Sequence, residues 1–194
     1  CIISSQPPVS ERGLTGIRFL TPLPDRIGLL MPLKLAIITT GGTIDKVYYD
    51  AKSDYQIGDP QIKAILDRVG ATIEFEVKDI FQKDSLDITE EDRQSVLEEV
   101  QRTEAEYIIL THGTDTMVET AKLLRTHVSG KTIVLVGSLT PARFRESDAE
   151  FNIGVAVGAV QSLAHGVYLA MNGVVFDPSK VRKNRAENRF EPLA

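Results

Sequence analysis

Cysteine is nearly absent from this sequence of 194 residues, in which Cys1 is the only one. A disulfide within the chain needs two cysteines, so neither a disulfide framework nor a metal site built of several thiolates can form. The three histidines, His112, His127 and His165, lie far apart and lack the spacing to carboxylates that a zinc site needs. The glycine turns also have no Gly-Lys-Thr or Gly-Lys-Ser continuation, so a phosphate-binding NTP loop is absent. We therefore expect no metal and no other cofactor.

Long hydrophobic runs are missing as well. The longest candidate, residues 151–164, is interrupted by Asn152, Gln161 and two glycines, and a membrane helix needs roughly 18 apolar residues. Gly154 and Gly158 are interpreted instead as positions where a helix packs closely on a sheet. Positive charge is also scarce, since the net charge is −5 and the pI about 5.3. Nucleic acid and membrane surfaces are anionic, so neither is an expected partner. The scarcity of cysteine is compatible with a reducing cytoplasm, which is the location we expect.

The first thirty residues differ from the rest of the chain. They contain four prolines and show neither a helical nor a strand-like period. No basic start is followed by an apolar stretch of signal-peptide length, and Met31 directly precedes the first predicted strand. We expect residues 1–30 to be a disordered leader or a non-native extension. Residues 31–194 are then predicted to form a single α/β domain.

From Met31 onward, segments typical of strands alternate with segments typical of helices. Asp59 and Pro60 indicate the start of one helix, and Thr89 followed by Asp92 resembles a capping box for another. Asn172 and Gly173 form the strongest short-range signal for a β-hairpin. The pattern predicts a three-layer α/β fold with a mostly parallel sheet, flanking helices and a C-terminal β-hairpin. The expected strands cover residues 33–38, 72–80 (near an edge), 107–110, 132–136, 166–171 and 174–176, and the last helix covers 148–163.

Two turns rich in glycine and hydroxyl groups follow two of these strands. One is T-T-G-G-T-I at residues 39–44, and the other is T-H-G-T-D-T-M at residues 111–117. In an open α/β sheet, ligands bind beyond the carboxyl ends of the strands at a topological switch point. Either turn alone has a composition that is common in strand-to-helix connections. Two such turns from separate strands predict that both face one ligand.

At these turns the chain resembles the N-terminal domain of the bacterial-type asparaginase and glutaminase family. The elements T-G-G-T-I at residues 40–44 and H-G-T-D-T-M at residues 112–117 are similar to the two signature sequences of that family. Residues 53–58 resemble its mobile lid, and residues 84–89 resemble its loop for the substrate carboxylate. The resemblance extends in order over residues 33–190. It implies hydrolysis of L-asparagine to L-aspartate and ammonia, with glutaminase activity as a possible side reaction and a homo-oligomer with shared sites.

Amide hydrolysis requires a nucleophile, donors for the developing oxyanion, a proton for the departing ammonia, and anchors for the substrate. The resemblance implies that Thr43 is the nucleophile and that Tyr55, in the lid, orients or activates it. Thr114 is then the second catalytic hydroxyl, and Asp115 binds the α-ammonium group of the substrate. The implied substrate-binding residues are Gly42, Ser85, Gly113, Thr114 and Asp115.

Several of these residues also have structural interpretations. His112 is more typical of a hydrogen-bonded structural histidine than of a base, and Asp115 would also suit a helix N-cap. Ser85 and Tyr55, taken alone, would be ordinary loop and surface residues. A threonine hydroxyl is a weak nucleophile at neutral pH, so some neighbouring group must accept its proton.

The sequence departs from the family at three points. The chain stops where the second domain of usual members begins. Usual members also carry a lysine near the second threonine, and counting back from Gly166 places that lysine at Val160 or Gln161, neither of which can act as a base. Lys46 and Lys52, near or in the lid, could replace the missing lysine as the base, although both are more typical of exposed loop charges. Leu86 and Thr140 stand where some members have polar or charged residues.

These departures leave three hypotheses. The leading one is a single-domain asparaginase whose site is open or completed by a second copy. The second is a non-catalytic module that keeps the pocket for binding an amino acid or a partner. The third is a nucleic-acid site, which the overall acidity and the absence of interleaved aromatic residues disfavour. It would use the basic cluster Lys180, Arg182, Lys183, Arg185 and Arg189.

Overall fold

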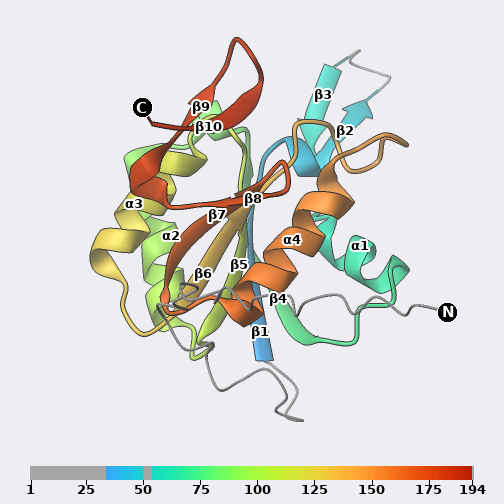
Figure 1. Ribbon diagram of the computed structural model, residues 1–194. Coiled ribbons are helices and arrows are strands. Elements are labelled where there is room, and N and C mark those ends of the chain that lie inside the picture. Colours follow the sequence, from blue (N-terminus) through green and yellow to red (C-terminus); the bar gives the residue numbers. More distant parts are fainter. Residues whose placement is uncertain (1–33, 50–53, 194) are drawn as a thin grey trace, which may run out of the picture.

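A computed structural model describes residues 34–49 and 54–193 of the chain (Figure 1). The leader proposed for residues 1–30 and the candidate base Lys52 lie outside the described residues. No helix in the described part is both long enough and apolar enough to cross a membrane.

A six-stranded sheet forms the centre of the fold, with the strand order β4-β1-β5-β6-β7-β8. All neighbouring strands are parallel except β7 and β8. The predicted edge position of residues 72–80 is confirmed, since β4 is the first strand in the order and its residues are exposed or half-buried. The strands are β1 (Lys34–Gly41), β4 (Glu74–Lys83), β5 (Tyr107–Thr111), β6 (Thr132–Val136), β7 (Gly166–Met171) and β8 (Val174–Phe176).

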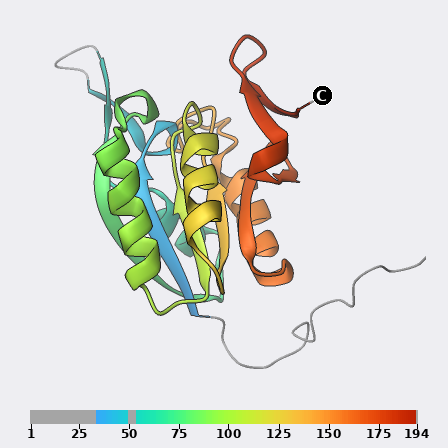
Figure 2. The ribbon, with the colours of Figure 1, turned by 90° about the vertical axis from the view of Figure 1, so that its left-hand side faces the viewer.

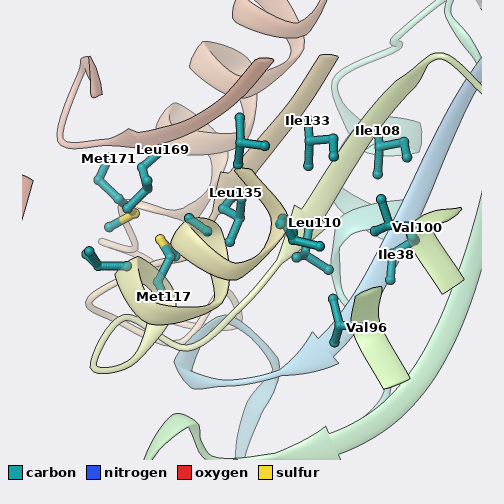
Figure 3. Packing of buried hydrophobic residues seen from close by; sticks show 14 of the residues in the cluster. Ile38, Val96, Val100, Ile108, Leu110, Met117, Ile133, Leu135, Leu169 and Met171 are labelled. Atoms are coloured by element: carbon teal, nitrogen blue, oxygen red, sulfur yellow. The ribbon is translucent and has the colours of Figure 1, made fainter. Parts of the chain in front are cut away.

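Helices cover both faces of the sheet (Figures 1 and 2). One face packs against α2 (Glu90–Arg102) and α3 (Met117–His127), and Figure 3 shows their side chains among those of the strands. The other face packs against α1 (Ile62–Arg68) and α4 (Ala149–Ser162). Strands β5 and β6 are buried throughout apart from Tyr107, because both of their faces are covered. The prediction of a three-layer α/β fold is therefore confirmed.

The predicted helix starts have different outcomes. The capping box of α2 is confirmed, because the Thr89 side chain accepts from the Asp92 N–H while the Asp92 carboxylate accepts from the Thr89 N–H. The prediction that Asp59 caps α1 is wrong, since α1 begins at Ile62 with Gln61 at the N-cap. The N–H of Gln61 donates instead to Oδ1 of Asp45, at 2.8 Å. A carboxylate from a different segment thus binds near the start of this helix.

The predicted hairpin between β7 and β8 is confirmed. Asn172 and Gly173 have φ angles of 54° and 79°, and this left-handed pair suits a two-residue hairpin turn. The interpretation of Gly154 and Gly158 is wrong, because a Cβ at either position would have no atom within 4 Å. Both glycines lie on the exposed side of α4, and the buried positions Ile153 and Ala156 pack on the sheet instead.

Two small antiparallel ribbons extend beyond the carboxyl end of the central sheet (Figure 1). One consists of β2 (Lys46–Tyr49) and β3 (Asp54–Ile57), the segment that resembles the lid. The other, β9 (Val181–Asn184) with β10 (Arg189–Pro192), was not predicted from the sequence. Short 3-10 turns lie in the nearby connections, namely η1 (Thr43–Asp45), η3 (Ser85–Asp87) and η4 (Pro178–Lys180).

Candidate active site

The candidate site lies at the carboxyl ends of β1 and β5, which are neighbours in the sheet. From β1 the chain continues to β4 on one side, and from β4 it returns to β5 on the other side of β1. This reversal makes the gap between the loops after β1 and β5 a topological switch point, where α/β proteins bind ligands. The position expected for the two glycine turns is therefore confirmed.

The two turns approach each other so closely that only glycine fits between them. A Cβ at Gly42 would lie 2.5 Å from both Cα and N of Gly113. A Cβ at Gly113 would in turn lie 2.6 Å from Cβ of Ser85. Gly42 also has a φ angle of 91°, which residues with side chains rarely adopt. The missing side chains thus bring three loops together, those of residues 41–44, 112–116 and 84–87.

Hydrogen bonds fix the Ser85 loop against the second turn. Oγ of Ser85 accepts from the backbone N–H of Asp115 at 3.3 Å, and the carbonyl of Ser85 accepts from the hydroxyl of Thr116 at 2.7 Å. Ser85 is 2% exposed, so these bonds lie largely out of contact with water. Ser85, Thr114 and Asp115, which were selected from the sequence, are therefore neighbours in the fold.

A lysine that was not placed in the site from the sequence completes this group. Nζ of Lys183, on β9, donates to Oγ1 of Thr114 at 2.6 Å and to Oδ1 of Asp115 at 3.0 Å. The Lys183 side chain is only 10% exposed. The expectation that Thr114 has no lysine beside it is thus wrong. Val160 packs in the core under α4, and Gln161 donates to the carbonyl of Val157, so the counting along that helix pointed to the wrong element.

The β9-β10 ribbon holds Lys183 in place through two apolar anchors. Val181 and Phe190 are 1% and 6% exposed and join the core cluster that includes α3 and β7. The ring of Phe190 also packs against that of Phe176, with centroids 6.4 Å apart. Buried residues on both strands of the ribbon therefore fix the height of Lys183 above the sheet.

The basic cluster is engaged in ion pairs within the chain. Arg182 and Arg189 both pair with Glu191, at 2.7 and 3.6 Å. Lys183 and Arg185 both pair with Oδ1 of Asp115, Arg185 at 3.4 Å. Four of the five cations therefore form ion pairs with carboxylates of this domain. The cluster thus takes part in contacts within the chain.

Thr43 and Tyr55, the implied nucleophile and its partner, lie on the first turn and the ribbon that follows it. Thr43 opens η1 and is half-buried. Tyr55 stands opposite Tyr48 in the β2-β3 ribbon, with ring centroids 5.5 Å apart, and its ring lies 6.2 Å from that of Phe144. These contacts tie the ribbon to the loop after β6.

Lys46, the other candidate base, is paired elsewhere. Its ammonium lies 2.6 Å from Oδ2 of Asp84, the residue before Ser85, and its side chain is 26% exposed. Burial alone would raise the pKa of Asp84, but the bonds from Lys46 and the Leu86 N–H, and the charge of Lys183, hold it below its ordinary value. Lys46 thus links the ribbon to the Ser85 loop, and its ion pair is with Asp84.

Asp45, two residues after Thr43, carries an unusual buried carboxyl group. It is 1% exposed, and its Oδ2 has no hydrogen-bond partner within the described structure. Burial raises the pKa of Asp45 to about 7, an effect that the N–H of Gln61 opposes and the nearby Asp79 increases. This residue was not selected from the sequence, because a single Asp in a turn resembles an ordinary loop charge.

The interpretation of His112 as a structural residue is confirmed. It is fully buried, its Nδ1 lies 2.8 Å from the carbonyl of Gly113, and its Nε2 lies 2.9 Å from Oγ1 of Thr120. A carbonyl only accepts, so Nδ1 carries the proton and Nε2 accepts from Thr120. Burial lowers the pKa of His112 to about 4, which keeps the ring neutral at physiological pH. Within the described residues, no group of three or more His, Cys, Asp or Glu side chains is arranged to hold a metal ion.

Comparisons with known proteins agree with this geometry. The family described as "Asparaginase, N-terminal" matches residues 34–191. L-asparaginase 2 of Escherichia coli K12 is 31% identical over 164 residues, which is 77% of this chain and 46% of the relative. A subunit of the glutamyl-tRNA(Gln) amidotransferase of Methanococcus maripaludis C6 is 33% identical, over 80% of this chain and 40% of the relative. The solved structure of the thermostable L-asparaginase from Thermococcus kodakarensis has a TM-score of 0.73 at 27% identity, covering 83% of this chain and 51% of that one.

Proposed function

Because the chain belongs to the asparaginase family, matching its N-terminal domain over residues 34–191, we propose that it is an amidohydrolase that releases ammonia from the side-chain amide of an asparagine-like substrate. The chain spans about half the length of the curated relatives it matches. L-asparagine, with L-aspartate as product, is the first substrate to test.

The contact of Lys183 with Thr114 and Asp115 is the observation that carries this proposal. An amine 2.6 Å from a threonine hydroxyl and 3.0 Å from a carboxylate oxygen forms a proton-transfer group in a largely buried position. Thr114 and Asp115 lie on the loop that meets the Thr43 turn at Gly42 and Gly113. A surface ion pair in a binding module would have no need of the Thr114 hydroxyl.

In the first step, Oγ of Thr43 attacks the carbonyl carbon of the amide. Its proton has to leave, and Tyr55, on the ribbon after the turn, is the group we assign to orient or activate it. Backbone N–H groups at the two glycine turns, which meet at Gly42 and Gly113, are the donors we assign to the developing oxyanion. When the C–N bond breaks, the amide nitrogen takes up a proton and departs as ammonia.

In the second step, water hydrolyses the ester formed on Thr43. We assign activation of this water to Thr114, whose hydroxyl Lys183 contacts. A neutral lysine amine accepts a proton, and the same group, once protonated, donates it back. Water delivers its oxygen to the acyl carbon, and the Thr43 hydroxyl regains its proton. A carboxylate product and the free enzyme result.

The carboxylate of the substrate is assigned to Ser85. Its hydroxyl lies at the junction of the two loops, where it accepts from the Asp115 N–H. We favour asparagine over glutamine only by family resemblance. A pocket discriminates one methylene by about 1–3 kcal/mol, so a side activity on glutamine is compatible with the proposal.

Assembly and location are part of the same proposal. Phe151, Val174 and Val175 are 62%, 48% and 38% exposed, and the two valines lie on β8, the edge strand next to α4. Exposed apolar groups beside an open sheet edge suit contact with another copy of the chain, so we propose a homo-oligomer. We further propose a cytoplasmic location. One relative is described as a probable cytoplasmic L-asparaginase and another as a probable periplasmic one.

Mass spectrometry of the quenched reaction tests the covalent step. The chain is mixed with L-asparagine or its deamino analogue succinamate, quenched in acid within milliseconds to seconds, and digested. We expect the acyl mass on the peptide that contains Thr43, and none in Thr43→Ala. Binding of the products without turnover of either amide would instead indicate a non-catalytic binding module.

A further inference from the structure

Asp45 lies at the base of the β2-β3 ribbon and binds both ends of it. The residue follows Thr43 by two positions and directly precedes β2. Its carbonyl accepts from the N–H of Gly58, just after β3, and its Oδ1 accepts from the N–H of Gln61, both at 2.8 Å. The N–H of Asp45 in turn donates to the carbonyl of Gly42 at 3.1 Å. Asp45 thus joins the start of the ribbon, its end and the first glycine turn.

The surroundings of this base are closely packed. A Cβ at Gly58 would lie 3.1 Å from Cγ1 of Val47 and 3.4 Å from the carbonyl oxygen of Asp45. The carbonyl of Ile44 accepts from the N–H of Ala142 at 3.1 Å, which fixes the turn to the loop after β6. A movement of Asp45 therefore changes the contacts of both strands of the ribbon.

The carboxyl group of Asp45 is suited to this place only when it is uncharged. It is 1% exposed, and within the described structure its Oδ2 has no hydrogen-bond partner. A buried charge without a partner costs far more free energy than a buried neutral group in the same position. A protonated carboxyl keeps the bond from Gln61, because its carbonyl oxygen still accepts.

The charged groups of the neighbouring elements do not neutralise this carboxyl. Lys46 on β2 and Lys63 on α1 each form an ion pair with another carboxylate. The strongest field of a nearby charge is that of Asp79 on β4, which is also negative. Burial is the main cause that raises the pKa of Asp45 to about 7, and Asp79 adds to it.

We propose that Asp45 is a positioning residue of the amide-hydrolysing site, and that its protonated form holds the ribbon that carries Tyr55 against the turn that carries Thr43. Ionisation draws the carboxylate toward water, which weakens the bond to Gln61 and loosens the base of the ribbon. Because Tyr55 is assigned to orient Thr43, the loss acts on kcat more than on KM. The effect on turnover rests on the proposed function, whereas the response of the ribbon can be measured without a substrate.

Nuclear magnetic resonance of the chain labelled with [ε-13C]tyrosine tests the link between Asp45 and the ribbon, with the Tyr55 signal assigned through Tyr55→Phe. We expect this signal to shift between pH 5 and pH 8 in the wild type, with a midpoint near pH 7. In Asp45→Asn it should stay at its acidic position, because asparagine is neutral and keeps an oxygen that accepts from Gln61. Asp59→Asn, a matched change at an exposed carboxylate just before α1, should titrate as the wild type does. A wild-type signal that does not move, or an equal shift in Asp45→Asn, would overturn the inference.

Kinetics with L-asparagine tests the consequence for turnover. The ratio of kcat for Asp45→Asn to kcat for the wild type cancels the ionisations that both share, that of Lys183 included. We expect this ratio to be near unity at pH 5 and to rise severalfold by pH 8, with similar KM values. Asp45→Ala, which lacks an acceptor for Gln61, should have a lower kcat than Asp45→Asn at every pH.

Two kinetic results would count against the positioning role, namely a constant ratio over this pH range and a change confined to KM. Failure of the proposed function is a different result. The wild type would then release no ammonia at any pH, while the Tyr55 signal would still titrate in the wild type and not in Asp45→Asn.

Discussion

At the scale of single residues, the site depends on a lysine brought to Thr114 from 69 positions further along the chain. Counting along a helix placed this lysine on the wrong element, and Lys183 was interpreted as one member of a basic run. Thr43, Thr114, Asp115 and Ser85 could be selected because they follow strands or lie in recognisable motifs. A contact across 69 residues depends on how a ribbon folds back, which spacing alone does not reveal.

Replacing Lys183 by methionine tests its part in proton transfer. Methionine keeps much of the length and apolar stem of lysine but cannot accept or donate a proton at that position. We expect kcat of Lys183→Met to fall by about 10²–10⁴-fold, the usual range for a general acid or base. Lys180→Met, on the same segment but exposed, should retain activity. Equal kcat for Lys183→Met and the wild type in steady-state ammonia assays would remove Lys183 from the mechanism.

Asp45 gives the stability of the domain a distinct dependence on pH. Its pKa is about 7 in the folded state and 3.8 as the ordinary value. The folded state therefore holds a proton that the unfolded state has lost, and the free energy of unfolding falls as pH rises through this window. Asp45→Asn resembles the protonated form and should be more stable than the wild type at pH 8, with the difference shrinking toward pH 4. Urea unfolding at pH 5, 6, 7 and 8 measures it, and a constant difference would contradict the raised pKa.

At the scale of elements, the pattern of apolar residues predicted the strands that build the core. Strands β5 and β6 have the pattern of buried runs because both faces are covered, and Asn172 with Gly173 marked the hairpin. The β9-β10 ribbon was missed because few of its residues are buried, and its other side chains are mostly charged. Its position depends on Val181 and Phe190 packing against α3 and β7, a contact that no local pattern signals.

Two glycine-to-alanine substitutions distinguish a glycine that close packing of loops requires from a glycine that only lowers helix propensity. Gly113→Ala would place a Cβ 2.6 Å from Cβ of Ser85, so the loops must separate. We expect its kcat/KM to fall by about 10²-fold, as a misplacement of about 1 Å can cause. Gly154→Ala, with no atom near the new Cβ, should raise the free energy of unfolding by about 0.5–1 kcal/mol and leave kcat/KM unchanged. Comparable kinetics for the two variants would show that the meeting of the loops is not needed.

At the scale of the whole molecule, the exposed apolar edge leads to a prediction about assembly. Val174 lies on β8 at the edge of the sheet and is 48% exposed. A lysine there would place a charge in the proposed contact between copies, so Val174→Lys should shift the chain toward the monomer. Sedimentation velocity at several concentrations measures this shift. A wild-type chain that sediments as a monomer at all concentrations would rule out the homo-oligomer.

The Thr43 turn, the Thr114 turn and the β9-β10 ribbon together form the proposed amide-hydrolysing site. Its most direct test is ammonia release from L-asparagine and from succinamate by the wild-type chain, Thr43→Ala and Lys183→Met, side by side. We expect the wild type to release ammonia from at least one amide, Thr43→Ala to release none above background, and Lys183→Met to be slowed by at least about 10²-fold. Ammonia release by Thr43→Ala at the wild-type rate, or no release by the wild type from either amide, would contradict this mechanism.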